Sequence, residues 1–308
     1  MPARRTPPTS KKSLSWDVWL ALGLVYVVWG STYLAIRFAI RTLPPFGMAG
    51  ARFLVSGGLL FLFMSLRGVP TPPLRQWRSA GIVGFLLITV ANGGVCWLER
   101  WVPSGMTALL VGTVPLWIAF LLVLGPKGTQ PSVATWSGLF LGFLGIVLLV
   151  SGRHHGSFEV DPWGALGLVG TSLAWAIGSL YARKADLPAS PLMGTSLEMI
   201  LGGAGQIVVS LLLGEFGGFH LSGISQVSWE AWIYLTFIGS LVGFTSYIWV
   251  LQKATPELAS TYAFVNPVIA VFLGWSLGGE TLTGGLFLAA GCIVAAVTLV
   301  VWGSRKGP

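Results

Sequence analysis

Residues 29–37 of the sequence read WGSTYLAIR and residues 175–183 read WAIGSLYAR, so one pattern of aromatic, small and arginine residues occurs twice, 146 positions apart. The same offset places Arg52 opposite Glu198. Each copy lies among about five hydrophobic stretches of the roughly 20 residues that cross a bilayer. Because five is odd, the second copy enters the membrane from the face opposite to the first. We therefore expect an inverted repeat, in which two related half-sites surround the membrane midplane.

The composition is that of a membrane protein. Only 9% of the 308 residues are charged, 54% are hydrophobic and the mean hydropathy is +0.79. A water-soluble chain could not cover its surface with so few charges. We predict an all-α polytopic membrane protein whose ten transmembrane helices form two inverted five-helix repeats. The predicted helices are residues 17–38, 47–66, 78–98, 104–124, 132–151, 162–182, 191–213, 229–251, 257–277 and 282–302.

The net charge of +8 reflects topology. If the N-terminus lies inside the cell, 13 of the 18 basic residues fall in cytoplasmic segments, which satisfies the positive-inside rule for short loops. This distribution predicts a multi-pass protein of the inner (plasma) membrane with both termini cytoplasmic, and gives no indication of nucleic-acid binding. The basic residues predicted on the opposite face of the membrane are Arg37, Arg41, Arg100 and Arg153. The remaining one, Arg52, lies within a span.

The chain divides into two repeats and two tails. Residues 1–16 are polar and basic and lack the apolar segment of a signal peptide, so we predict a disordered cytoplasmic tail. Residues 17–151 form the first five-helix repeat and residues 162–302 the second. Residues 303–308 form a second cytoplasmic tail.

Several short motifs, in their order and repeat spacing, resemble the EamA group of the drug/metabolite transporter superfamily. They are Trp29-Gly30-Ser31-Thr32, Pro103-Ser104, Pro115, Asn266-Pro267 and Gly279-Glu280. The resemblance covers residues 18–302 and implies a basket of ten helices around a central cavity, lined chiefly by spans one, three, four, six, eight and nine. It also implies export of amino acids or related small metabolites.

The first span of this sequence differs from that of a distant branch of the superfamily. Small multidrug resistance proteins carry a membrane-embedded glutamate in their first span, which exchanges protons for cationic drugs. The first span here has no acidic residue except Asp17 at its start. That specific mechanism is therefore not expected.

Charged groups within spans are costly and are functional candidates by default. Arg52 and Glu198 occupy equivalent positions in the two repeats, and we expect a gating or structural ion pair in preference to direct binding of substrate charge. Glu99 and Arg100 end the third span and are predicted to be interfacial. Glu280 is predicted to cap the start of the tenth span.

The candidate substrate site combines aromatic and neutral polar residues of the spans that the resemblance places around the cavity. Paired aromatic rings could hold an apolar side chain or a cation. The predicted substrate-binding residues are Trp29, Thr32, Asn92, Trp97, Trp175, Ser179, Tyr247, Tyr262 and Asn266.

Pro115 and Pro267 occupy matching places in the two repeats. A proline removes a backbone donor and frees the carbonyl oxygen four residues earlier. Such interruptions are tolerated at membrane depth where they line protein or a wet cavity. We predict hinges at both positions, with an ordinary kink as the alternative.

These features predict a secondary transporter that works by alternating access, with membrane lipids and a small-molecule substrate as partners. The sequence contains no phosphate-binding loop, and His154, His155 and His220 lie in loops without a carboxylate constellation, so we expect neither an enzyme nor a cofactor or metal site. We expect a monomer or weak homodimer. The alternatives are a flippase for a lipid or cell-wall precursor, and efflux of amphiphilic drugs.

Overall fold

The computed structural model describes residues 16–125, 132–151, 161–253, 262–282 and 284–304, and these contain helices and turns but no strand. The predicted tails lie almost wholly outside these ranges, as does Arg153. The helices are α1 (Trp16–Ala39), α2 (Pro45–Leu66), α3 (Leu74–Gly84), η1 (Phe85–Asn92), α4 (Gly93–Leu98), α5 (Ser104–Val111), α6 (Val114–Leu124), α7 (Val133–Ser151), α8 (Pro162–Ala182), α9 (Pro191–Leu212), η2 (Leu221–Gly223), α10 (Gln226–Tyr234), η3 (Leu235–Val242), α11 (Gly243–Lys253), α13 (Tyr262–Ser276) and α14 (Gly284–Ser304).

Seven helical stretches in the described ranges are long and apolar enough to cross a membrane. Two of them are composite: one runs from α3 through η1 to α4, and another from α10 through η3 into α11. Three further apolar helical stretches are shorter, Val133–Gly145, Val265–Ser276 and Gly284–Ala296. The all-helical membrane fold is confirmed.

Local sequence explains where several helices begin. Pro45, Pro162 and Pro191 each stand in the first turn of a helix, where the missing N–H of proline costs nothing. The Asp161 carboxylate accepts from the backbone N–H of Gly164 at 2.8 Å and so caps α8. These signals fix the ends of the spans more sharply than hydropathy does.

The structure departs from the predicted regular helices at η1 and η3, which are both π-helical and lie 150 positions apart. A side chain of a neighbouring helix bonds to each. Gln206 of α9 donates to the Ile88 carbonyl oxygen at 2.7 Å, and Ser56 of α2 donates to the Thr236 carbonyl oxygen at 2.9 Å. π-Helical turns are rare and are frequent at functional sites.

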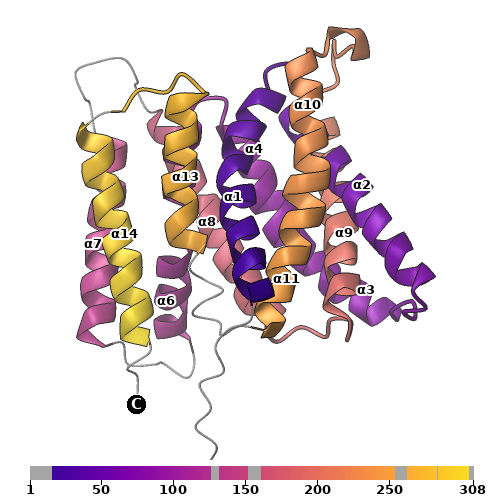
Figure 1. Ribbon diagram of the computed structural model, residues 1–308, viewed down its shortest axis with the longest axis horizontal. Coiled ribbons are helices and arrows are strands. Elements are labelled where there is room, and N and C mark those ends of the chain that lie inside the picture. The colour runs from indigo at the N-terminus through magenta and orange to yellow at the C-terminus, as the bar shows by residue number, and fades with distance from the viewer. Residues whose placement is uncertain (1–15, 126–131, 152–160, 254–261, 283, 305–308) are drawn as a thin grey trace, which may run out of the picture.

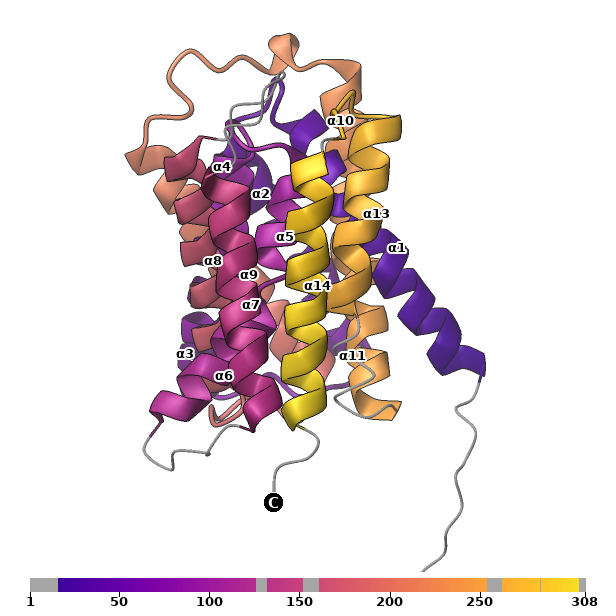
Figure 2. The same cartoon turned by 90° about the vertical axis from the view of Figure 1, so that its left-hand side faces the viewer.

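The helices form one elongated bundle in which repeat-equivalent elements make equivalent contacts. In Figure 1, α7 and α14 pack side by side at one end, and α2 and α9 pack together at the other. Between them, α1 contacts η3, α11 and α13, while α8 contacts η1, α5 and α6. In Figure 2, α7, α13 and α14 run in nearly the same direction while α1 is inclined to them, and the start of α1 and the end of α14 lie towards the same end of the bundle.

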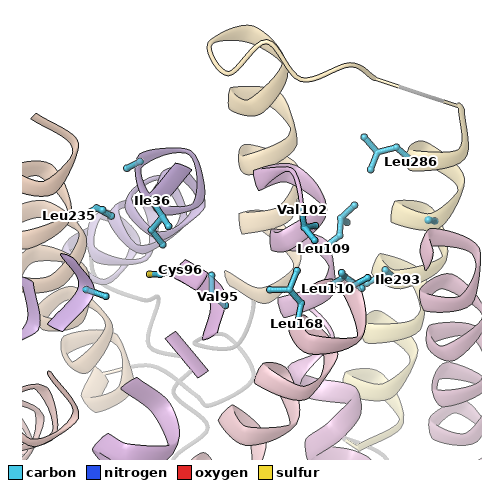
Figure 3. Close-up of a cluster of buried hydrophobic side chains, with 14 of the residues drawn as sticks. Ile36, Val95, Cys96, Val102, Leu109, Leu110, Leu168, Leu235, Leu286 and Ile293 are labelled. Atoms are coloured by element: carbon cyan, nitrogen blue, oxygen red, sulfur yellow. The ribbon is translucent and has the colours of Figure 1, made fainter. Parts of the chain in front are cut away.

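The largest buried hydrophobic cluster connects the two repeats (Figure 3). It runs from Ile36 of α1 and Leu235 of η3 past Val95 of α4 to Leu110 of α5 and Ile293 of α14. In a bilayer, such contacts stabilise the fold through close packing, because lipid tails are as apolar as the side chains. The packing of this cluster fixes the relative positions of the helices that carry the polar groups described below.

Candidate functional site

The aromatic cluster at the centre of the site joins α1, α11 and α13. The ring centroid of Trp29 lies 5.2 Å from Phe244, 5.0 Å from Tyr247 and 5.2 Å from Tyr262, and the two tyrosine rings are 5.5 Å apart. Gly243 makes this arrangement possible, since a Cβ atom there would lie 2.5 Å from the Trp29 indole nitrogen. Three predicted substrate-binding residues therefore meet, together with Phe244, which the sequence analysis missed.

Two of the predicted polar residues lie beside this cluster. Asn266 of α13 is buried, and in the orientation that satisfies its amide the nitrogen donates to the carbonyl oxygens of Tyr26 and Tyr262, at 3.3 and 3.2 Å. Thr32 donates from its hydroxyl to the Trp29 carbonyl oxygen at 2.7 Å. Both side chains therefore donate hydrogen bonds to backbone carbonyl oxygens next to the aromatic cluster.

The remaining aromatic candidates lie elsewhere. Trp97 of α4 contacts Phe46 and Trp101, with ring centroids 5.8 and 5.9 Å away. Trp175 and Ser179 are half-buried on α8. In the part of the chain that the structure describes, no ring contact connects Trp97 or Trp175 with the Trp29 cluster.

Arg52 of α2 is only 3% exposed, and its partner is Asn92 of η1. Its Nη2 donates to Asn92 Oδ1 at 3.3 Å, and the guanidinium stacks on Phe53 at 4.2 Å from the ring centroid. Phe53 in turn lies 6.3 Å from Phe244, which links Arg52 to the aromatic cluster.

Two guanidinium nitrogens of Arg52, Nε and Nη1, are buried and have no hydrogen-bond partner among the described residues. Glu198 is half-buried on α9, and no ion pair joins it to Arg52 in the same part of the chain. Such unpaired donors on a buried cation are groups that an anion could accept hydrogen bonds from.

The two prolines predicted as hinges differ in local structure. The fourth span breaks at Gly112 and Thr113, between α5 and α6, and Pro115 stands in the first turn of α6. Pro267 lies inside a continuous α13. Gly112, at the break before α6, lies close to Pro267, because a Cβ atom on Gly112 would be 3.1 Å from Pro267 Cγ.

Glu280, which follows α13, does not act where the sequence analysis placed it. Its carboxylate accepts from Ser104 N and Ser104 Oγ at 2.7 and 2.6 Å and from Gly105 N at 3.0 Å, and it pairs with Arg37 of α1. It therefore caps α5, because folding brings the start of α5 beside the end of α13, and among the described residues it accepts no bond from the tenth span. A helix N-terminus favours a carboxylate through its free N–H groups and its dipole.

Glu99 and Arg100, which were both predicted to be interfacial, differ in their exposure. Arg100 is exposed, donates from Nε to the Trp97 carbonyl oxygen at 3.1 Å and stacks on Trp97 and Trp101. Glu99 is 5% exposed, and neither of its carboxyl oxygens has a hydrogen-bond partner among the described residues.

The comparisons with known proteins agree with the helical bundle. The EamA-like transporter family matches residues 15–151 and 162–302. The inner membrane transporter YedA of Escherichia coli (strain K12) is 41% identical over 291 residues, which cover 94% of this chain and 92% of YedA. A probable amino-acid metabolite efflux pump of Salmonella typhimurium (strain LT2) is 24% identical over 311 residues, which cover 94% of this chain and 96% of the pump.

A solved crystal structure shares the fold at 18% sequence identity, with a TM-score of 0.64 over 94% of this chain and 99% of the other. The family thus matches two segments that together make up most of the chain, and the identity to YedA extends over the same length. The chain belongs to the EamA-like transporter family and is an inner membrane transporter.

Proposed function

We propose that this protein exports amino acids or closely related carboxylate metabolites by alternating access. The observation that carries the proposal is the chain of contacts from Arg52 through Phe53 and Phe244 to Trp29. The two unpartnered guanidinium nitrogens suit a carboxylate, and the aromatic cluster suits an apolar side chain or an ammonium group. The relative named as an amino-acid metabolite efflux pump supports the same substrate class.

We further propose that residues 17–151 and 162–302 are two inverted five-helix repeats, with ten spans in all and both termini in the cytoplasm. The equivalent contacts of α1 and α8, and the π-helical segments η1 and η3, support this internal symmetry. Rocking of one half against the other would then expose the site to each side in turn. The proposed hinge is the region where Gly112, three residues before Pro115, lies against Pro267.

The substrate class is tested by the thermal stability of the purified protein in detergent. A ligand that binds the folded state raises the melting temperature by mass action. We expect aromatic and branched amino acids to raise it, and the corresponding amines, which lack the carboxylate, to have no effect. Stabilisation by the amines alone would support efflux of amphiphilic cations, for which the aromatic cluster also provides a site.

Trp29→Ala is expected to abolish the amino-acid-induced rise in melting temperature, because it removes the ring that contacts Phe244, Tyr247 and Tyr262. Trp163→Ala is the matched control, since Trp163 is 78% exposed. The control should show the full rise. An equal response of both variants would place the ligand outside the aromatic cluster.

Arg52→Gln is expected to weaken binding of a carboxylate ligand at least tenfold, since charge-assisted hydrogen bonds contribute about 1.5–3 kcal/mol each. Apparent affinities follow from the dependence of melting temperature on ligand concentration. If Arg52 acts only as a structural or gating group, the variant will bind the amino acid with unchanged affinity and the carboxylate must be held elsewhere.

A further inference from the structure

Glu99 lies in the turn that follows α4, one residue beyond the span that ends at Leu98. The next residue, Arg100, is exposed, so Glu99 sits at an end of the bundle and close to water. Its own carboxyl group is nevertheless buried and has no hydrogen-bond partner among the described residues. A buried ionised carboxylate without partners is strongly destabilising, and such a group holds a proton instead.

The neighbours of Glu99 explain why it has no partner. The charged groups that act on it electrostatically are Glu280 and Arg37, and Glu99 in turn acts on the neighbouring Tyr33 and Cys96. Of these, only Arg37 carries a positive charge, and Arg37 pairs with Glu280. Two buried carboxyl groups therefore lie near a single arginine, and Glu280 is the one that forms an ion pair with it.

Glu280 is also the better supported carboxylate of the two. It accepts three further hydrogen bonds from Ser104 and Gly105, whereas Glu99 accepts none among the described residues. Arg52 of α2 and Glu215 after α9 act electrostatically on the neighbouring Cys96. If Glu99 ionises, the three groups Glu99, Glu280 and Arg37 carry a net negative charge in a buried site.

Burial, with a further contribution from Glu280, holds the pKa of Glu99 well above its usual range, although Arg37 acts in the opposite direction. The same Arg37–Glu280 pair ties α1 to the turn after α13 and to the start of α5. Loss of the proton from Glu99 would create a second anion that competes for Arg37.

We propose that Glu99 is a proton-binding site of this transporter, and that release of its proton weakens the Arg37–Glu280 pair that joins α1, α5 and the turn after α13. The proposal deepens the alternating-access export proposed above, on which its role in transport rests, by naming an ion that drives the change. A proton that enters or leaves at Glu99 alters the contacts between elements at one end of the bundle.

Proton release on unfolding tests the first part. On this proposal folded Glu99 keeps its proton near pH 7, whereas an unfolded glutamic acid, with a pKa of about 4.3, has lost it. Protein in weakly buffered detergent at pH 7 is unfolded with SDS, and a pH indicator records the protons released. We expect the wild type to release about one proton per molecule more than Glu99→Gln.

Glu230→Gln is the matched control, because Glu230 is an exposed glutamate on α10. This variant should release as many protons as the wild type, because an exposed carboxyl group is in contact with water before and after unfolding. Equal release from wild type and Glu99→Gln would overturn the proposal. Because no substrate is added, this outcome would leave the amino-acid assignment untouched, just as failure of the ligand screen would leave the proton site standing.

The second part is tested by repeating the measurement over a range of starting pH. The extra proton disappears as the pH rises through the pKa of folded Glu99, which gives a midpoint. Arg37→Gln removes the attracting cation and should move this midpoint to higher pH. Glu280→Gln removes the competing anion and should move it to lower pH. Midpoints that stay fixed in both variants would show that Glu99 titrates independently of the Arg37–Glu280 pair.

Discussion

Glu280→Gln is expected to lower the free energy of unfolding by about 3 kcal/mol or more, the range found when one partner of a buried ion pair is removed. The amide keeps one acceptor oxygen but turns an NH2 group toward donors. Arg37 and the backbone N–H groups of Ser104 and Gly105 then compete for that single oxygen. A buried donor left without a partner costs about 1–3 kcal/mol.

The measurement is equilibrium unfolding in mixed micelles, followed by tryptophan fluorescence. Glu230→Gln provides the reference, because surface substitutions change stability by only about 0.5 kcal/mol in either direction. A loss below about 1 kcal/mol in Glu280→Gln would mean that the α5 cap and the Arg37 pair contribute little to stability. The Arg37→Gln variant would then separate the two contributions.

Gly84→Ala is expected to destabilise the protein by about 1–3 kcal/mol, the typical cost of forcing extra atoms into a packed core. Gly84 ends α3, where this helix crosses α9 with the backbones in direct contact. A Cβ atom on Gly84 would overlap the carbonyl oxygen of Glu198, and one on Gly202 would lie 2.6 Å from the carbonyl oxygen of Gly84. Backbone atoms cannot rotate away as a flexible side chain can.

Gly58→Ala is the matched control for this prediction. Gly58 lies within α2, and a Cβ atom there would meet nothing within 4 Å. Alanine favours a helix by up to about 1 kcal/mol over glycine, so the control should be neutral or more stable. Equal effects of the two substitutions would show that the α3–α9 crossing relaxes to accept the added methyl group.

One part of the site was predictable from the sequence. Trp29, Tyr247 and Tyr262 lie in spans that the family resemblance places around the cavity, and their rings do meet. The repeat alone did not predict this, because Trp175, the copy of Trp29, makes no ring contact with it among the described residues. An offset of 150 positions, in place of 146, aligns Gly93 with Gly243 and pairs the two segments that the structure shows to be π-helical.

Other parts depend on how each helix is rotated and how deep each residue lies, which no local pattern records. Arg52 and Glu198 match in the sequence, yet Arg52 donates to Asn92. Trp97 and Trp175 lie in the expected helices but make no ring contact with Trp29 in the described part of the chain. Successive side chains on a helix point about 100° apart, so residues at equivalent positions of two repeats need not face each other.

The sequence by itself determined the fold class, because a bilayer requires long apolar stretches whose backbone hydrogen bonds are satisfied internally, and this requirement is written locally in composition. Only the tertiary structure decided which charged groups interact. Glu280 reaches across 176 positions to Ser104, and Glu99 is buried with no hydrogen-bond partner in the part of the chain that the structure describes. Such pairings depend on atoms brought within about 3 Å by the packing of several helices, a geometry that exists only once the whole bundle has assembled.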